Sequence, residues 1–174
     1  MVEKTHNHLL SCEQYLKDEE WHKAREIIIK LLEITPDDHW LLAQLSSTYY
    51  EERDYAKAYE FITDAFVLNP DCPFVMWHLA GTFEMLNKTD EALVIWEEIL
   101  KRGVKKIAFG ECAEGMDRAK SLLADCKYRA GFAYLRQGNK KKALKYLKAY
   151  ASDIAKSIET IYDKVKALDE IKNL

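Results

Sequence analysis

The sequence repeats itself with a period of 34 residues, and this period restricts the possible fold more than any other feature. Aromatic residues, alanines and prolines all recur at this step, in the sets Tyr15, Tyr49 and Phe83, then Ala24, Ala58 and Ala92, then Pro36 and Pro70. A fixed period of about 20 to 50 residues is the signature of proteins that stack one supersecondary unit several times. The chain is therefore expected to fold as a series of similar units.

Within one repeat, small and large apolar residues recur at helical spacing on two consecutive segments. Asp54 and Thr89 lie between such segments and are predicted N-caps, because their side chains can accept hydrogen bonds from the free N–H groups of the next helix. Pro36 and Pro70 follow the second segments, where proline ends a helix. Each repeat is therefore predicted to be two amphipathic helices, in the second repeat with the apolar and small positions Leu42, Leu45, Ser46, Tyr49, Ala58, Ile62 and Ala65.

This pattern resembles the tetratricopeptide repeat (TPR), whose signature places large, small, tyrosine, alanine and proline positions along a helix pair. The third repeat keeps the signature but has Val104 where proline is expected, and the first repeat has His8 and Ser11 at positions that are usually apolar. A fourth repeat lies out of step, because Ala92 and Ala143 are 51 residues apart, which is 17 more than one period. The resemblance covers nearly the whole chain and is specific for the fold.

The resemblance implies an all-α fold, a right-handed α-solenoid of four TPR-like helix-turn-helix repeats with a C-terminal capping helix. A single TPR-like domain is expected over residues 1–174, in which the insertion 107–123 extends the first helix of the fourth repeat. The repeats themselves are expected at about 5–38, 39–72, 73–106 and 124–154.

The C-terminal segment, at about 153–172, carries an apolar stripe at helical spacing, formed by Ile154, Ile158, Ile161, Val165, Leu168 and Ile171. Because an open repeat stack needs its last apolar face covered, the segment is predicted to be a capping helix. The same stripe would also serve as a seam for a second subunit.

The insertion opens with the stretch IAFGECAEG, whose residue types occur in reactive loops. A nucleophilic cysteine needs a base or another source of thiolate stabilisation, and no histidine lies in the segment around Cys112. Gly110 and Gly115 have the spacing of a phosphate-binding loop, but Met116 and Asp117 follow where lysine and a hydroxyl residue are required. The four cysteines form no CxxC pair. We therefore expect a protein that is not an enzyme and has no catalytic residue, metal or cofactor.

The resemblance also implies which side chains line a concave groove, namely those at the second, fifth, sixth, ninth and twelfth positions of each repeat. These positions, which include Asp125, are rich in aromatic side chains, the usual composition of a recognition surface. With Arg136 added as a cation for an acidic ligand end, the predicted partner-binding residues are Trp40, Gln44, Ser47, Tyr50, Phe74, Trp77, His78, Tyr128, Arg129, Phe132 and Arg136. The alternative is that some of the aromatic residues pack against the insertion or the C-terminal segment.

The predicted function is therefore protein–protein interaction, in which the groove binds a peptide or helix of a partner protein without chemistry. Family members that hold the acidic C-termini of chaperones have lysine, asparagine and arginine at five positions. Here those positions hold Leu9, Glu13, Gln44, Phe74 and His78, so that class of partner is disfavoured. The alternatives are a TPR-type secretion chaperone and a self-assembling structural protein that uses the C-terminal helix and the bipolar charge.

Charged residues are distributed unevenly although the formal net charge is only −3. Residues 31–100 hold 14 acidic and 3 basic side chains, whereas residues 118–150 hold 10 basic and 1 acidic. This distribution predicts that charge orients a peptide partner, or a second copy in a homo-oligomer. Lysines such as Lys141 and Lys145 lie on one helix face without a nucleic-acid-reading motif, so no nucleic-acid partner is expected.

The N-terminal sequence and the apolar runs bear on location. MVEKTHNHLL lacks the basic-then-apolar order of a secretory signal. The uncharged runs HWLLAQLSSTYY and CPFVMWHLAGTF have 12 residues each, whereas a membrane-spanning helix needs about 20 apolar residues. We expect a cytoplasmic protein without a membrane partner.

Overall fold

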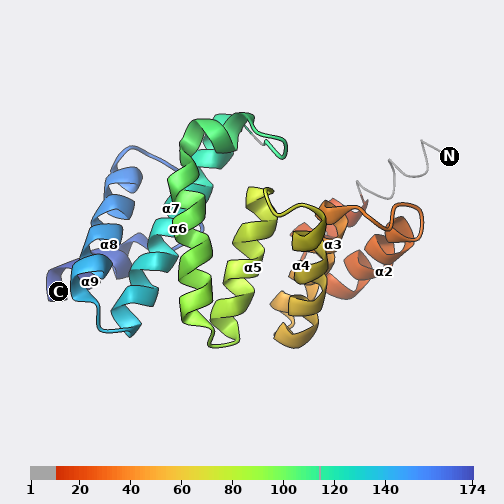
Figure 1. Ribbon diagram of the computed structural model, residues 1–174, viewed down its shortest axis with the longest axis horizontal. Helices are drawn as coiled ribbons and strands as arrows, with labels where there is room; N and C mark the ends of the chain where they lie inside the picture. Colours follow the sequence, from red (N-terminus) through yellow and green to blue (C-terminus); the bar gives the residue numbers. More distant parts are fainter. Residues whose placement is uncertain (1–10, 114) are drawn as a thin grey trace. The chain divides into compact units, whose positions relative to one another are not determined.

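The computed structural model describes residues 11–113 and 115–174, and all regular secondary structure in these ranges is helical (Figure 1). The chain forms two compact units, the first ending at Lys88 and the second beginning at Thr89. In the described part of the chain, none of the helices is long and apolar enough to cross a membrane.

The N-terminal unit begins with a helical segment at 11–17; the expected start of the first repeat, at 5–10, lies outside the described residues. Its further helices are α2 (Trp21–Leu32), α3 (His39–Glu51), α4 (Tyr55–Leu68) and α5 (Pro73–Met85). Helix α3 packs against α2, α4 and α5. This unit therefore contains helix pairs of the length and order that the repeat pattern predicts.

Helix starts in this unit follow the sequence closely. The Asp38 carboxylate accepts from the N–H groups of Trp40 and Leu41 at the start of α3, and the predicted cap Asp54 accepts from the N–H of Lys57 at the start of α4. The prediction for Thr89 is wrong, because α6 already includes Thr89 as its first residue. The residue 34 positions after Asp54, where the repeat would place the next N-cap, is Lys88.

The C-terminal unit contains α6 (Thr89–Phe109), α7 (Gly115–Arg136), α8 (Lys140–Ala155) and α9 (Lys164–Asn173). Helix α6 is interrupted at Gly103, where φ is 73° and ψ is 163°. Positive φ is a conformation that glycine adopts without a steric penalty, so Gly103 permits the chain to change direction there. Helix α7 has 22 residues because the part of the expected insertion from Gly115 onward forms its first turns.

The small residues of the repeat mark the places where helices cross closely. Ala58, Ala92 and Ala143 are all fully buried. The hydroxyl of Ser46 on α3 donates to the carbonyl of Ala58 on α4 at 2.7 Å. A Cβ on Gly131 of α7 would lie 2.7 Å from a methyl carbon of Leu147 on α8, so this crossing has no room for a side chain.

The single continuous C-terminal helix expected at about 153–172 is not observed. Helix α8 ends at Ala155, and Ser157 has a φ of 61°, a left-handed conformation that ends helices. The N–H groups of residues 156–158 turn back to the carbonyls of Asp153 and Ile154. The apolar stripe is thus divided between α8, a non-helical segment and α9, and two of its members are exposed, Ile161 at 74% and Val165 at 63%.

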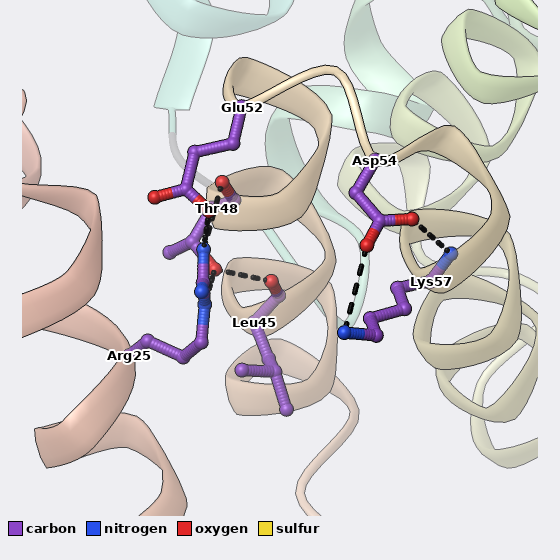
Figure 2. A network of polar contacts seen from close by, with 6 residues as sticks. All are labelled: Arg25, Leu45, Thr48, Glu52, Asp54 and Lys57. Carbon is purple, nitrogen blue, oxygen red and sulfur yellow. Dashed lines mark hydrogen bonds and ion pairs between the residues drawn. The ribbon is translucent and has the colours of Figure 1, made fainter.

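The N-terminal unit is fastened by a polar network between α2 and α3 (Figure 2). The Arg25 guanidinium donates to the hydroxyl and the carbonyl of Thr48, at 3.2 and 3.4 Å, and pairs with the carboxylate of Glu52. It also lies 3.9 Å from the ring centre of Tyr49. One cation therefore satisfies several acceptors along α3 and covers an aromatic face, which fixes the two helices against each other.

Candidate peptide-binding surface

In the N-terminal unit, seven predicted binding residues lie on two helices that contact each other, α3 and α5. All seven are half-buried: Trp40, Gln44, Ser47 and Tyr50 on α3, and Phe74, Trp77 and His78 on α5. The fully buried positions of the same helices are held by other residues, among them Leu41, Leu45, Met76 and Leu79. The half-buried set is therefore additional to the core.

The aromatic residues of α3 and α5 are held by neighbouring rings of the same unit. The ring of His78 lies edge-on to those of Phe74, at 4.4 Å, and Trp77, at 5.1 Å. Tyr50 makes an edge-on contact with Tyr55 at 5.4 Å, and Trp40 packs on the core cluster of α2 and α3. Side chains fixed in this way lose little conformational entropy when a ligand covers them.

In the C-terminal unit, the remaining predicted residues lie along α7 and differ in exposure. Tyr128 is buried, with 9% of its surface exposed, whereas Arg129 and Phe132 are half-buried and Arg136 is exposed. The rings of Tyr128 and Phe132 are in contact at 4.5 Å. The structure therefore brings Tyr128, Arg129 and Phe132 together.

The α7 residues contact the chain's own C-terminal segment. The ring of Tyr162 stacks on that of Tyr128 at 4.4 Å with an interplanar angle of 4°. The Arg129 guanidinium donates to the Tyr162 hydroxyl at 2.8 Å, and the Lys166 ammonium lies 5.0 Å from the ring centre of Phe132. For α7, the alternative interpretation of the aromatic positions, packing against the C-terminal segment, is correct.

Asp125 is the acidic residue among the groove positions of α7. The hydroxyl of Thr160 donates to its carboxylate at 2.5 Å, and the backbone N–H of Ile161 also donates to it. Burial raises the pKa of Asp125 to about 6, although the hydrogen bonds from Thr160 and Ile161 and the charge of Arg129 act in the opposite direction. Asp125 thus holds both a side chain and the main chain of residues 160–161.

Sequence reasoning did not identify the residues that face α7 from the C-terminal segment, Thr160 and Tyr162. They lie on either side of Ile161 among other polar residues such as Ser157 and Glu159, so the sequence does not single them out. On a helix they would point in different directions, whereas in an extended chain residues two apart share one side.

The buried thiols give no support to chemistry at this surface. Burial, followed by the charge of Glu13, raises the pKa of Cys12 to about 11. Burial also raises the pKa of the Cys126 thiol, which lies next to Asp125 on α7. Both cysteines are therefore protonated at neutral pH, and a protonated thiol is a poor nucleophile.

Comparison with known proteins agrees with the helix pairs described above. Residues 125–153 match the sequence model of a tetratricopeptide-repeat family. The structure is similar to a crystal structure of MamA protein, with 19% identity over 89% of this chain and 75% of that chain and a TM-score of 0.64. It is also similar to a putative kinesin light chain from Podospora anserina with nearly identical TPR-like repeats, with 12% identity over 97% and 83% of the two chains and a TM-score of 0.68.

A third similar structure is the N-terminal domain of stress-induced protein-1 from C. elegans, with 19% identity over 79% of this chain and 94% of that chain and a TM-score of 0.58. At these identities the likeness shows the fold. The chain is an all-α protein whose fold resembles that of TPR-like repeat proteins, and its residues 125–153 match the tetratricopeptide-repeat sequence model directly. The resemblance seen in the sequence and the expected fold class are thereby confirmed.

Proposed function

We propose that the protein is a non-catalytic protein–protein interaction module that binds a peptide or helix of a partner, through α3 and α5 in the first unit and through α7 in the second. In this proposal the two units act as one domain over residues 1–174. The observation that carries it is the half-buried aromatic set of α3 and α5, which lies outside the core positions of the repeat. Aromatic side chains of this kind supply most of the binding energy in protein interfaces.

The charges of the two units support an oriented mode of binding. The first unit has 16 acidic and 8 basic residues, and the second has 13 acidic and 18 basic. The basic end of a peptide is therefore attracted to the first unit and its acidic end to the second. Arg129 and Arg136 on α7 are the proposed contacts for the acidic end.

Self-assembly as a structural protein is a second candidate, and the exposed Ile161 and Val165 favour it. The break at Ser157 removes the continuous seam that a helical stripe would have offered a second subunit. Only these two large apolar side chains of the stripe remain strongly exposed. We rank it below partner binding because a stable interface buries on the order of 800 Å² on each side.

The test is partner capture by the full chain with Phe74→Ala and Trp77→Ala combined. The matched control is Val67→Ala on α4 of the same unit, because Val67 is an apolar side chain with 75% exposure on an outer helix. We expect the control to recover partner proteins as the unchanged chain does and the double variant to lose them. Equal recovery by all three chains would refute the proposed surface.

A further inference from the structure

The segment that joins α8 to α9, residues 156–163, crosses the inner face of α7 without forming a helix. It leaves α8 through the left-handed Ser157 and enters α9 at Asp163, whose carboxylate accepts from the N–H of Val165. Between these points the chain contacts the second, fifth and sixth positions of the fourth repeat, held by Asp125, Tyr128 and Arg129. These are positions that the family resemblance assigns to ligand contact.

The contacts within the segment alternate along the chain. The side chain of Thr160 turns to Asp125 and that of Tyr162 to Tyr128 and Arg129, while Ile161 between them is 74% exposed. The chain bends at residues 161–162, where the N–H of Tyr162 donates to the Thr160 hydroxyl at 3.2 Å, and Thr160 and Tyr162 both face α7.

The surface also recognises the main chain of the segment. The carboxylate of Asp125 accepts from the N–H of Ile161, and the hydroxyl of Tyr150 donates to the carbonyl of Tyr162 at 2.8 Å. The same Tyr150 ring meets Tyr128 edge-on at 5.2 Å. The surface therefore offers the main chain of the segment a donor, the hydroxyl of Tyr150 on α8, and an acceptor, the carboxylate of Asp125 on α7.

We propose that residues 158–163 are an internal ligand of the α7 surface, and that the partner which this surface fits is a peptide with a hydroxyl residue followed two residues later by an aromatic residue. Such a peptide makes the contacts of Thr160 and Tyr162 and must displace the internal segment to reach α7. This inference rests on the proposed function and specifies the partner's chemistry.

The experiment uses the full chain and a fluorescein-labelled synthetic peptide of residues 156–166, with binding followed by fluorescence anisotropy. The variant Thr160→Ala/Tyr162→Ala weakens the internal segment and leaves α7 unchanged. We expect it to bind the peptide at least about tenfold more tightly than the unchanged chain, because apparent affinity scales with the fraction of binding-competent surface. The same peptide carrying Tyr162→Ala should not bind to it.

The matched control is Ile161→Ala/Val165→Ala, which alters two exposed side chains of the same region and should leave peptide binding as weak as in the unchanged chain. Equal binding to all three chains, or equal binding of the Tyr162→Ala peptide, overturns the proposal. So does a dimer of the unchanged chain that the peptide dissociates, because the segment would then belong to a second copy.

A second measurement covers the case in which the double variant does not fold. Hydrogen exchange of the unchanged chain is followed without peptide and with peptide at about 10 mM, above the millimolar effective concentration of the tethered segment. The amides of residues 160–162 should exchange faster when the peptide is present. No change in exchange at saturating peptide contradicts displacement. Partner capture that depends on Phe74 and Trp77 is scored separately, so the proposed function can stand when this inference fails.

Discussion

The same repeat positions differ in burial and in contacts between α5 of the first unit and α7 of the second. On α7 the buried Tyr128 is sandwiched into contacts with Tyr150 and Tyr162 of the same chain, whereas on α5 the corresponding position, Trp77, is half-buried beside His78. The register of a repeat therefore determines where a side chain points, and the neighbouring sequence determines what it meets there. An aromatic residue at the same repeat position is half-buried beside a histidine in one repeat and packed between rings of its own chain in the next.

The largest expected difference between the two faces is in stability. Replacing Tyr128 by alanine removes a buried ring with three aromatic neighbours, so we expect the free energy of unfolding to fall by about 3 to 5 kcal/mol. The matched change Trp77→Ala removes a half-buried ring and should cost about 1 to 2 kcal/mol. Urea denaturation of the full chain measures both, and equal losses would contradict the contrast.

The second prediction concerns pH, through Asp125. Its pKa is raised from 3.8 to about 6 in the fold, so between these values the folded chain keeps a proton that the unfolded chain has released. The contribution of this group to the free energy of unfolding is therefore largest below about pH 4 and falls as the pH rises to 6, by at most about 3 kcal/mol.

Asp125→Asn keeps an acceptor for Thr160 and removes the titration. The stability of the unchanged chain relative to the variant should therefore decline between pH 4 and pH 6, as measured by denaturation at each pH. A difference that stays constant over this interval would show that burial does not raise the pKa of Asp125.

The third prediction concerns the polar network around Arg25, which fixes α2 against α3 in the N-terminal unit. Arg25→Ala removes the half-buried cation that joins α2 to Thr48, Glu52 and Tyr49, and should cost about 2 kcal/mol (Figure 2). Lys57→Ala breaks the exposed pair with Asp54, at 3.6 Å, and the contact of its ammonium with the Tyr49 ring, at 5.2 Å, and should cost below about 1 kcal/mol. Thermal unfolding of both variants separates the two; equal shifts would mean that the Arg25 network adds nothing beyond a surface ion pair.

The smallest expected effect is electrostatic. If the charge difference between the units orients a partner, raising the ionic strength from about 0.05 to 0.5 M should weaken its association several-fold, because surface charges are screened within about 10 Å at 0.1 M salt. Association rates measured by stopped-flow fluorescence with a captured partner test this. Association rates that do not change with salt would show that charge does not orient the partner.

Much of the helix arrangement was accessible from the sequence because periodicity reports on burial. Ala58, Ala92 and Ala143 are small positions of the repeat pattern, and each lies buried within its unit. The cap at Asp54 followed from a local rule of hydrogen bonding. These features depend on residues near one another in sequence, where patterns are direct evidence of geometry.

The C-terminal region could not be predicted in the same way. The stripe from Ile154 to Ile171 keeps helical spacing through Ser157, so nothing in its periodicity marks the break. The break is favoured by distant partners, since Asp125 and Arg129 hold Thr160 and Tyr162 from a helix more than 30 residues away. A local pattern carries no information about such competition.

Because the connection between α8 and α9 is short, a peptide that competes with it for α7 needs a minimum affinity. Residues 156–163 are anchored by a helix at each end, so after release the segment remains close to α7. A short tether of this kind gives an effective concentration in the millimolar range. A free peptide at micromolar concentration must therefore bind α7 about a thousandfold more tightly than the segment does, or else already be held elsewhere on the chain.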